Sequence, residues 1–475
     1  MSSPRPIIIV TGANSGIGFG ICERLLSDLS HTLPPDAKPQ FKSLSPGTAA
    51  QDVAPTESYD GATLILACRS EKKALEAKQR LLQGLDRRIA AGRRRADYDG
   101  HADVFRANLK IGFHQVDMSD AHSVFQFCEE IARTYPYVSH LVCNAGCAFW
   151  TGVDKLSAVR SILNRGLIWS ITLPPFKLQH TGKMSVDGLG CTWQSNIFGH
   201  YIMYRHLKPL FTEYAARYSR PARLIWQSSL EGQPCWYDHD DWQLVKTDHS
   251  YEGTKFQIDL IASKLNERSL LPGGEGHVVR HFLVHPGIAH SNMTNGMVYA
   301  FFDTLKLILF YIARWFGSPN HTITPYGAAI SATHIALASL LAIPSSLLAF
   351  AHRKNTDDPP RSLWDDSLST LSLYADCGME SAAEARDREQ HGQYVPLKFS
   401  SQTDSHGEGY VGVMPVLQWA KHAEESEFLV EKCEGLYQTF VKLEAKDGKG
   451  KVNGHANGHA NSHTNGHANG TSRHS

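Results

Sequence analysis

The sequence predicts an α/β protein built around a doubly wound parallel sheet. Short apolar runs, rich in β-branched residues, alternate with longer stretches of helical spacing along residues 1–350. The first run, residues 7–10, ends in a glycine-rich turn that leads into a helical pattern. Strands that alternate with helices form parallel sheets through right-handed crossovers. We therefore expect one domain over residues 1–350, with insertions and a carboxyl-terminal extension.

The expected strands are short and apolar, as buried strands of a parallel sheet are. They cover residues 7–10, 62–68, 112–117, 139–144, 222–227 and 278–285. The expected helices between them repeat apolar residues at helical spacing. They cover residues 21–26, 71–85, 123–135, 191–211 and 251–267. A further apolar stretch, residues 327–350, is predicted to be a helix that packs on the sheet.

Other segments depart from this alternation. Residues 31–60 are rich in Pro, Ser, Gln and Asp without an apolar period, which predicts an exposed, mobile insertion. Residues 351–446 are expected to form an extension that packs on the core, with a terminal helix pair over residues 409–443. Residues 447–475 repeat Asn, Gly and His, a composition typical of a disordered tail.

Residues 298–316 are dense in aromatic and aliphatic side chains but are interrupted by Asp303, Lys306 and Arg314. The segment is shorter and more charged than a membrane-spanning helix requires. Two interpretations remain open. The segment is either a substrate lid packed on the domain, or an amphipathic helix that lies in a membrane interface and admits a lipid.

Composition limits the classes of partner and compartment. The chain has 475 residues, of which 42% are hydrophobic and 20% are charged, enough to bury a large core. Its formal net charge is zero, so we expect no nucleic-acid partner. Its nine cysteines form no CxxC pair, which is typical of a reducing compartment. The amino terminus carries no signal-peptide pattern, so the domain is expected to face the cytosol.

Histidines recur every four residues in the tail, a spacing that would allow metal chelation on a helix. The Asn and Gly content between them opposes a helix. We therefore expect a spacer and no metal site. The histidines in question are His455, His459, His463 and His467.

Residues 11–18 read Thr-Gly-Ala-Asn-Ser-Gly-Ile-Gly and lie between an expected strand and an expected helix. Glycines there permit a tight turn and let a pyrophosphate approach the backbone at the amino end of the helix. We therefore expect this turn to bind a dinucleotide. The candidate binding residues are Gly12, Ser15, Gly16, Ile17 and Gly18.

Three further motifs follow in order along the chain. Asn144 opens an Asn-Ala-Gly sequence that closes the fourth strand, Ser229 follows the fifth strand, and Tyr251 and Lys255 form a YxxxK sequence at the start of a helix. Together with the TGxxxGxG turn, these motifs resemble the short-chain dehydrogenase/reductase family. The resemblance implies a Rossmann-type domain and an oxidoreductase that transfers hydride to or from a nicotinamide cofactor, with Asn144 in the cofactor site.

A tyrosine that exchanges a proton with a carbonyl oxygen near neutral pH needs a nearby cation, because its hydroxyl ordinarily titrates near pH 10. Lys255 lies one helical turn after Tyr251 and supplies that cation. Ser229 is expected to polarise the substrate oxygen, with Ser228 as the alternative serine. The family resemblance adds that Lys255 holds the nicotinamide ribose and that Asn196 holds a water molecule linking Lys255 to solvent.

The end of the second strand favours NADPH as the cofactor. That strand ends Cys68-Arg69-Ser70 without the carboxylate that binds the ribose hydroxyls of NAD, and the Arg69 guanidinium suits a 2′-phosphate. Asp117 resembles the residue that contacts the adenine amino group. The alternative is that Asp117 or Ser119 caps the following helix. Pro286 and Gly287 follow the sixth strand and complete the expected cofactor site.

Within the family, residues 250–260, 285–288 and 313–319 are similar to the fungal 3-keto-steroid reductases of ergosterol synthesis. The resemblance implies NADPH-dependent reduction of a 3-keto sterol in C4-demethylation to the 3β-alcohol. It also implies membrane-interface association at the endoplasmic reticulum or lipid droplets, beside other C4-demethylation enzymes and oxidosqualene cyclase. Two alternatives stay open: reduction of another hydrophobic carbonyl, such as retinal or a secondary metabolite, and a role mainly as a scaffold of the sterol enzymes.

Overall fold

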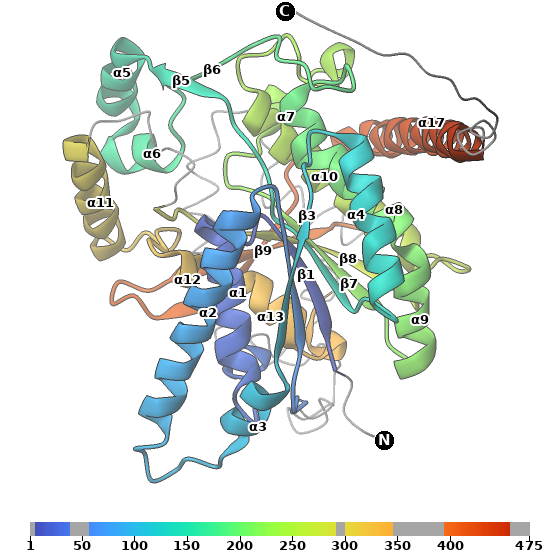
Figure 1. Cartoon of the computed structure of the whole chain (residues 1–475). Helices are drawn as coiled ribbons and strands as arrows, with labels where there is room; N and C mark the ends of the chain where they lie inside the picture. Colours follow the sequence, from blue (N-terminus) through green and yellow to red (C-terminus); the bar gives the residue numbers. More distant parts are fainter. Residues whose placement is uncertain (1–4, 39–56, 291–299, 345–393, 457–475) are drawn as a thin grey trace, which may run out of the picture.

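A single sheet of eight strands forms the centre of the part of the chain that the structure describes. The structure is a computed structural model and describes residues 5–38, 57–290, 300–344 and 394–456. The strand order is β10-β9-β8-β7-β4-β1-β2-β3, and every neighbouring pair is parallel except β9 and β10. The predicted doubly wound sheet is therefore confirmed (Figure 1). The strands are β1 (Ile7–Thr11), β2 (Thr63–Cys68), β3 (Lys110–Gln115), β4 (His140–Cys143), β7 (Ala222–Gln227), β8 (Val279–His285), β9 (Leu397–Thr403) and β10 (Gly409–Pro415).

Helices cover both faces of this sheet because its inner strands are apolar on both sides. In β1, Ile8 and Val10 belong to one core cluster, whereas Ile7 and Ile9 belong to the other. Helices α1, α2 and α13 contribute to the first cluster, and helices α4, α8, α9 and α10 contribute to the second. These helices are α1 (Gly16–Leu29), α2 (Glu71–Gly92), α4 (Ala121–Thr134), α8 (Gly199–His206), α9 (Lys208–Tyr218), α10 (Ser250–Leu270) and α13 (Ile330–Leu337).

The remaining elements are short or lie at the edges of the molecule. The helices are α3 (His101–Asn108), α5 (Lys155–Arg165), α6 (Leu167–Thr172), α7 (Cys191–Trp193), α11 (Ala300–Trp315), α12 (Pro325–Ala328) and α17 (Ala423–Ala456). A π-helical turn (Gln194–Phe198) joins α7 to α8. The 3₁₀ turns are η1 (Pro35–Ala37), η4 (Pro234–Trp236), η5 (His239–Asp241), η7 (Leu340–Ala342) and η9 (Trp419–His422). A separate hairpin pairs β5 (Trp150–Val153) with β6 (Lys177–Gln179).

The expectations for the carboxyl-terminal extension were partly wrong. The predicted helix pair over residues 409–443 is instead strand β10, the turn η9 and the single helix α17. Strand β9 was not predicted, yet it pairs with β8 and makes the extension part of the central sheet. Helix α17 also continues to Ala456, into the segment predicted to be disordered, because adding residues to an existing helix costs little. Residues 457–475 lie outside the described part.

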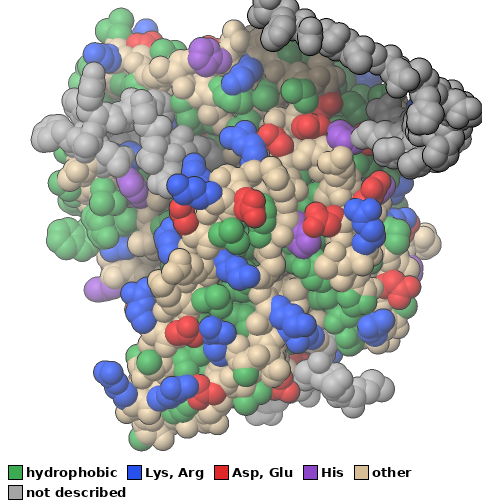
Figure 2. Space-filling model, in the orientation of Figure 1, with side chains coloured by type: hydrophobic (Ala, Val, Ile, Leu, Met, Phe, Trp, Pro, Cys, Tyr) green, Lys and Arg blue, Asp and Glu red, His purple; other side chains and the backbone are tan. Residues whose placement is uncertain are grey.

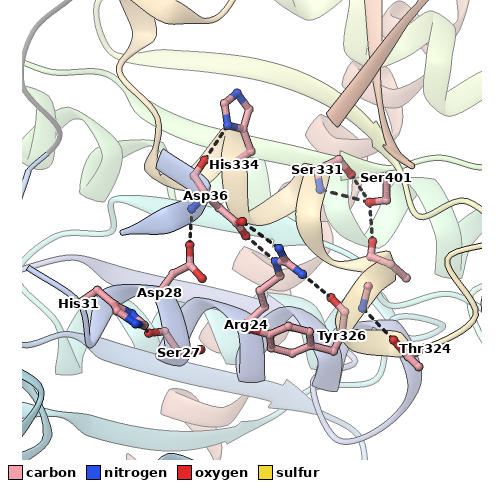
Figure 3. A network of polar contacts seen from close by, with 12 residues as sticks. Arg24, Ser27, Asp28, His31, Asp36, Thr324, Tyr326, Ser331, His334 and Ser401 are labelled. Carbon is pink, nitrogen blue, oxygen red and sulfur yellow. Dashed lines mark hydrogen bonds and ion pairs between the residues drawn. The ribbon is translucent and has the colours of Figure 1, made fainter. Parts of the chain in front are cut away.

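The start of the predicted mobile insertion, residues 31–60, is fixed onto the core. Figure 3 shows the polar network that holds it. The Arg24 guanidinium forms an ion pair with the Asp36 carboxylate. The backbone amide of Asp36 donates to the Asp28 carboxylate over 2.7 Å. The carbonyl of Asp36 contacts the His334 ring nitrogen at 2.7 Å, which joins η1 to α13. Residues 39–56 lie outside the described part, so the prediction of mobility stays untested there.

Two segments lie beyond the helices that cover the sheet. Helices α5 and α6, joined to the β5–β6 hairpin, form an insertion between β4 and α7 that was not predicted. Figure 1 draws these two helices and α11 on the same side of the molecule. Among the described residues, no helix is long and apolar enough to cross a membrane.

Candidate active site

The glycine turn lies where β1 ends and α1 begins. Gly12 has a φ of +66° and Gly16 a φ of +54°, values that favour glycine. A Cβ atom on Gly18 would lie 2.4 Å from the Gly12 carbonyl oxygen, so only glycine fits there. The Ser15 side chain precedes α1 without capping it, and Ile17 follows in the first turn. The amino end of α1 therefore keeps backbone amides available for a phosphate.

Asn144 holds this turn from the neighbouring strand β4. Its amide nitrogen Nδ2 donates to the Thr11 carbonyl over 2.9 Å. The Thr11 hydroxyl accepts from the backbone amides of Asn144 at 2.9 Å and Ala145 at 2.8 Å. The two loops meet at the carboxyl ends of β1 and β4, where the strand order reverses. Ligands of doubly wound sheets bind at such a point.

Arg69 lies beside Asp117 at the neighbouring strand ends. The Arg69 side chain is 77% exposed, and its guanidinium lies 3.6 Å from the Asp117 carboxylate. Asp117 accepts from the amide of Ser119 at 3.0 Å and from its hydroxyl at 2.7 Å. The cap of α4 is Asp120, so the alternative that Asp117 or Ser119 caps this helix is wrong.

Ser229, Tyr251 and Lys255 lie together beyond the carboxyl end of β7. The Ser229 side chain lies close enough to the Tyr251 hydroxyl to lower the pKa of the phenol. The Lys255 amine lies 5.5 Å from the centre of the Tyr251 ring and donates to the Gln227 carbonyl over 2.7 Å. Ser228 is buried instead, and its hydroxyl donates to the Lys255 carbonyl over 3.4 Å. Of the two serines, the structure therefore brings Ser229 to the tyrosine.

The expected acidification of Tyr251 is absent from the structure as it stands. Burial raises the pKa of Tyr251 above its usual range, and the carboxylates of Glu231 and Glu252 raise it further. Ser229 opposes this shift, because it favours the ionised phenol. Burial also lowers the pKa of Lys255 to about 8. Desolvation therefore affects the pKa of Tyr251 more than the Lys255 ammonium group does.

Asn196 occupies the π-helical turn between α7 and α8. Its side-chain oxygen accepts from the Cys147 amide at 2.7 Å, and its Nδ2 donates to the Cys147 carbonyl at 3.1 Å and the Thr254 hydroxyl at 3.0 Å. Asn196 thus joins the loop after β4 to the helix that carries Tyr251. Its predicted role in holding water stays untested.

Pro286 and Gly287 form the turn after β8. Gly287 has a φ of +69°, and a Cβ atom there would lie 2.5 Å from the Asn320 carbonyl oxygen. The Thr322 hydroxyl donates to the Pro286 carbonyl over 2.9 Å. The turn is therefore held by the segment that precedes α12.

Sequence reasoning missed the residues that the β5–β6 hairpin brings to this site. The Trp150 ring lies 5.5 Å from the Tyr251 ring. Lys177 pairs with Glu231, and Gln179 accepts from the Tyr251 amide at 2.9 Å. The sequence carries only a weak signal for these hairpin residues, because they follow no repeated spacing. The described residues contain no cluster of His, Cys, Asp and Glu suited to a metal.

Comparison with known proteins gives the following matches. No family model matches the chain. A 3-keto-steroid reductase from Kluyveromyces lactis is 27% identical over 336 residues, which covers 71% of this chain and 81% of that protein. One from Eremothecium gossypii is 32% identical over 221 residues, which covers 46% of this chain and 60% of that protein. A 3-keto-steroid reductase from Candida albicans is 28% identical over 334 residues, or 68% of this chain and 78% of that protein.

Among solved structures, a Pseudomonas aeruginosa RhlG/NADP active-site complex matches 70% of this chain and 90% of that chain, with a TM-score of 0.41 and 16% identity. The relatives from Kluyveromyces lactis and Candida albicans match 71% and 68% of this chain at 27% and 28% identity. The likeness to 3-keto-steroid reductases that the sequence predicts is thereby confirmed. The chain is a homologue of the fungal 3-keto-steroid reductases.

Proposed function

We propose that this protein uses NADPH to reduce the 3-keto group of a sterol intermediate of C4-demethylation to the 3β-hydroxyl. The observation that carries the proposal is that Ser229 lies close enough to the Tyr251 hydroxyl to lower the pKa of the phenol, with the Lys255 amine beside the tyrosine ring. The names of the relatives supply the substrate class, since they are 3-keto-steroid reductases. The expected place of the reaction is ergosterol biosynthesis.

The residues around the glycine turn fit a dinucleotide with a 2′-phosphate. Gly18 lets the first turn of α1 pack closely against the Gly12 carbonyl, and Asn144 fixes the turn in that shape. The exposed Arg69 guanidinium suits the extra phosphate, because β2 ends without the carboxylate that binds the ribose hydroxyls of NAD. When bound, reduced nicotinamide supplies the hydride that goes to the carbonyl carbon.

The protein's own groups act on the carbonyl oxygen. Ser229 and Tyr251 each present a hydroxyl that can donate to this oxygen. Because burial raises the pKa of Tyr251, the phenol keeps its proton until the oxygen becomes basic. Tyr251 then gives its proton to the alkoxide, and the ketone becomes an alcohol. We expect Lys255 to bind the nicotinamide ribose and to help return the proton.

A sterol enters from lipid, so we also propose that α5 and α11 contact a membrane. Helix α5 exposes Leu156 and Leu163 by 81% and 79%, beside the exposed basic side chain of Arg160. At the end of α11, Trp315 and Phe316 are each 78% exposed. Figure 2 shows hydrophobic side chains at its left edge, where Figure 1 draws α11. Apolar residues next to basic ones suit the interface of an anionic membrane.

The proposed membrane is that of the endoplasmic reticulum or the lipid droplet, on the cytosolic side. Neighbouring C4-demethylation enzymes and oxidosqualene cyclase remain proposed partners. On the face drawn in Figure 2, Lys and Arg are interspersed with Asp and Glu, so that face forms no basic surface for nucleic acid.

Turnover of a defined sterol tests the function. The purified full-length protein is incubated with NADPH and a 4-methyl-3-oxo-sterol, and the products are separated by gas chromatography and mass spectrometry. We expect the 3β-alcohol. Tyr251→Phe removes the proton donor and should lower kcat by about 10²–10⁴-fold, whereas Tyr98→Phe, in the part-buried contact with Asp103, should leave it unchanged. Turnover of retinal or another ketone but not of the sterol would overturn the sterol assignment.

Vesicle binding tests the membrane surface. Vesicles of phosphatidylcholine with phosphatidylserine are sedimented with the full-length protein. The double substitution Leu163→Ser and Trp315→Ser should abolish most of the bound fraction. The matched control is Leu75→Ser, which changes an apolar side chain that is 48% exposed on α2. Equal binding by the double variant and the control would contradict this surface.

A further inference from the structure

Lys398 and Asp259 form an ion pair in the interior of the protein. Lys398 lies on β9 in the carboxyl-terminal extension, and Asp259 lies on α10. Their side chains are 1% and 0% exposed. The second oxygen of the carboxylate, Oδ1, is buried and has no hydrogen-bond partner among the described residues.

The Lys398–Asp259 pair joins the loop that carries Ser229 to the helix that carries Tyr251 and Lys255. The Lys398 amine donates to the Ser229 carbonyl over 3.3 Å and to the Ser228 hydroxyl over 3.4 Å. Asp259 follows Lys255 by one turn of α10, on the same side of the helix. Lys398 thus contacts both the serine loop after β7 and Asp259, the charge with the largest effect on the pKa of Lys255.

Packing alone does not explain two buried charges at this position. Burying an ion pair costs desolvation of both groups, and apolar side chains of similar size often stabilise a core as well or better. The contact with the Ser229 carbonyl is also specific to an amine, since an aliphatic side chain donates no hydrogen bond. The location of the pair therefore indicates a use in the reaction.

We propose that Lys398 is a positioning residue of the active site, which holds the Ser229 loop and, with Asp259, sets the charge around Lys255. The proposal rests on the proposed function for the roles of Ser229 and Lys255. It makes the extension, through β9, a required part of the catalytic centre.

Groups from several elements act on the Lys255 amine. Burial is the largest effect and lowers the pKa of Lys255 to about 8. Among the charged groups, Asp259 on the same helix has the largest effect and raises the pKa, and Cys147 after β4 raises it less. Lys398 on β9 has the smallest effect and lowers the pKa. Burial lowers the pKa of His200 on α8 to about 4, and burial with Lys398 keeps the pKa of His285 on β8 well below its usual range. Both histidines are therefore neutral near pH 7. Because Asp259 outweighs Lys398, the pair as a whole favours the charged form of Lys255.

Two double variants test the proposal in the full-length protein. Asp259→Asn with Lys398→Met removes both charges and keeps an amide near Ser228. Asp259→Leu with Lys398→Met replaces the pair by apolar side chains. The matched control is Arg24→Met with Asp36→Asn, which removes a mostly buried ion pair in the network of Figure 3.

The first measurement is the dissociation constant of NADPH between pH 6 and 10, followed by its fluorescence, which needs no ketone. We expect the pH midpoint to fall by about one unit in both double variants and to stay unchanged in the control. The second is kcat/KM for the sterol ketone. It should fall about fivefold more at pH 8 than at pH 6, because a midpoint one unit lower leaves about a tenth of Lys255 charged instead of half.

An unchanged pH midpoint in both double variants would overturn the proposal. Failure of both to fold, seen by circular dichroism, would overturn it too, because an ion pair used for positioning is replaceable by apolar groups. The two hypotheses fail in different ways. A wild-type protein that reduces no sterol ketone contradicts the proposed substrate, while the NADPH midpoint still reports on Lys398 and Asp259.

Discussion

The Lys255 amine donates to the backbone carbonyl of Gln227 over 2.7 Å, at the last residue of β7. This bond ties the helix that carries Tyr251 to the strand that leads into Ser229. The backbone therefore fixes the positions of Ser229 and Tyr251 relative to each other. Lys255 has a structural task in addition to its charge.

The reduction rate should depend on pH through Lys255. Burial lowers the pKa of its amine to about 8, while the pKa of Tyr251 is raised and its phenol stays protonated at higher pH. Because reduction consumes a proton and uses the charged amine, kcat/KM should be level between pH 6 and 7 and fall as the pH rises through about 8. Initial rates with saturating NADPH measure this. A rate that is constant up to pH 10 would contradict the assignment.

Arg69 should decide the preference for NADPH over NADH. Loss of a charged hydrogen bond to the 2′-phosphate costs about 1.5–3 kcal/mol, so Arg69→Ala should raise the KM for NADPH about 10- to 100-fold. The KM for NADH should change less than about twofold. Arg95→Ala is the control, since Arg95 is another exposed arginine paired with an aspartate. Equal effects of Arg69→Ala on the two cofactors would show that Arg69 does not contact the phosphate.

The sequence contained enough information for most of the sheet and for the positions of the motifs. Buried parallel strands such as β1 are runs of β-branched residues, and the turn after β1 requires glycine for steric reasons. Strand β9 escaped detection because its residues Leu397–Thr403 include Lys398 and several hydroxyl side chains, all of which look solvent-exposed. Lys398 is buried only because Asp259, far away in the sequence, neutralises it.

The spacing of residues in the sequence did not predict the electrostatics of the site. The interval between Tyr251 and Lys255 predicts that the side chains are near each other, and the structure places the amine 5.5 Å from the ring centre. The interval does not reveal that the Glu231 carboxylate raises the pKa of the Tyr251 phenol, or that burial is the largest cause of that rise. Both effects depend on the β5–β6 hairpin and the loop after β7, whose positions no local pattern specifies.

Asp28 should make the stability of the protein depend on pH. Burial and the neighbouring Asp36 raise the pKa of Asp28 to about 7, above the ordinary value of 3.8. The folded protein therefore binds a proton at Asp28 more tightly than the unfolded chain does. The stability that this proton contributes is present below pH 4 and is lost as the pH rises through about 7. Asp28→Asn keeps an acceptor for the Asp36 amide and removes the charge (Figure 3).

The variant should accordingly raise the free energy of unfolding by about 1–3 kcal/mol at pH 8 and change it little at pH 4. Urea unfolding at the two pH values measures the difference. Asp97→Asn, in the exposed pair with Arg95, should show no such dependence. A gain that is equal at both pH values would mean that the charge of Asp28 is not its cause.

Gly18 should be irreplaceable for cofactor binding, whereas another helical glycine should not. A Cβ atom at Gly18 would lie 2.4 Å from the Gly12 carbonyl oxygen and 2.5 Å from Asn144 Nδ2, so Gly18→Ala must displace the turn or the Asn144 side chain. The dissociation constant of NADPH should rise at least about 100-fold, since both contacts shape the phosphate site.

Gly84 in α2 is the matched control, because nothing lies within 4 Å of the place where its Cβ would be. Gly84→Ala should leave NADPH binding unchanged and raise the free energy of unfolding by about 0.5–1 kcal/mol, because alanine loses less conformational entropy in a helix. Fluorescence titration and thermal unfolding of both variants separate the two effects. If Gly18→Ala bound NADPH as tightly as Gly84→Ala does, the turn between β1 and α1 would not be the pyrophosphate site.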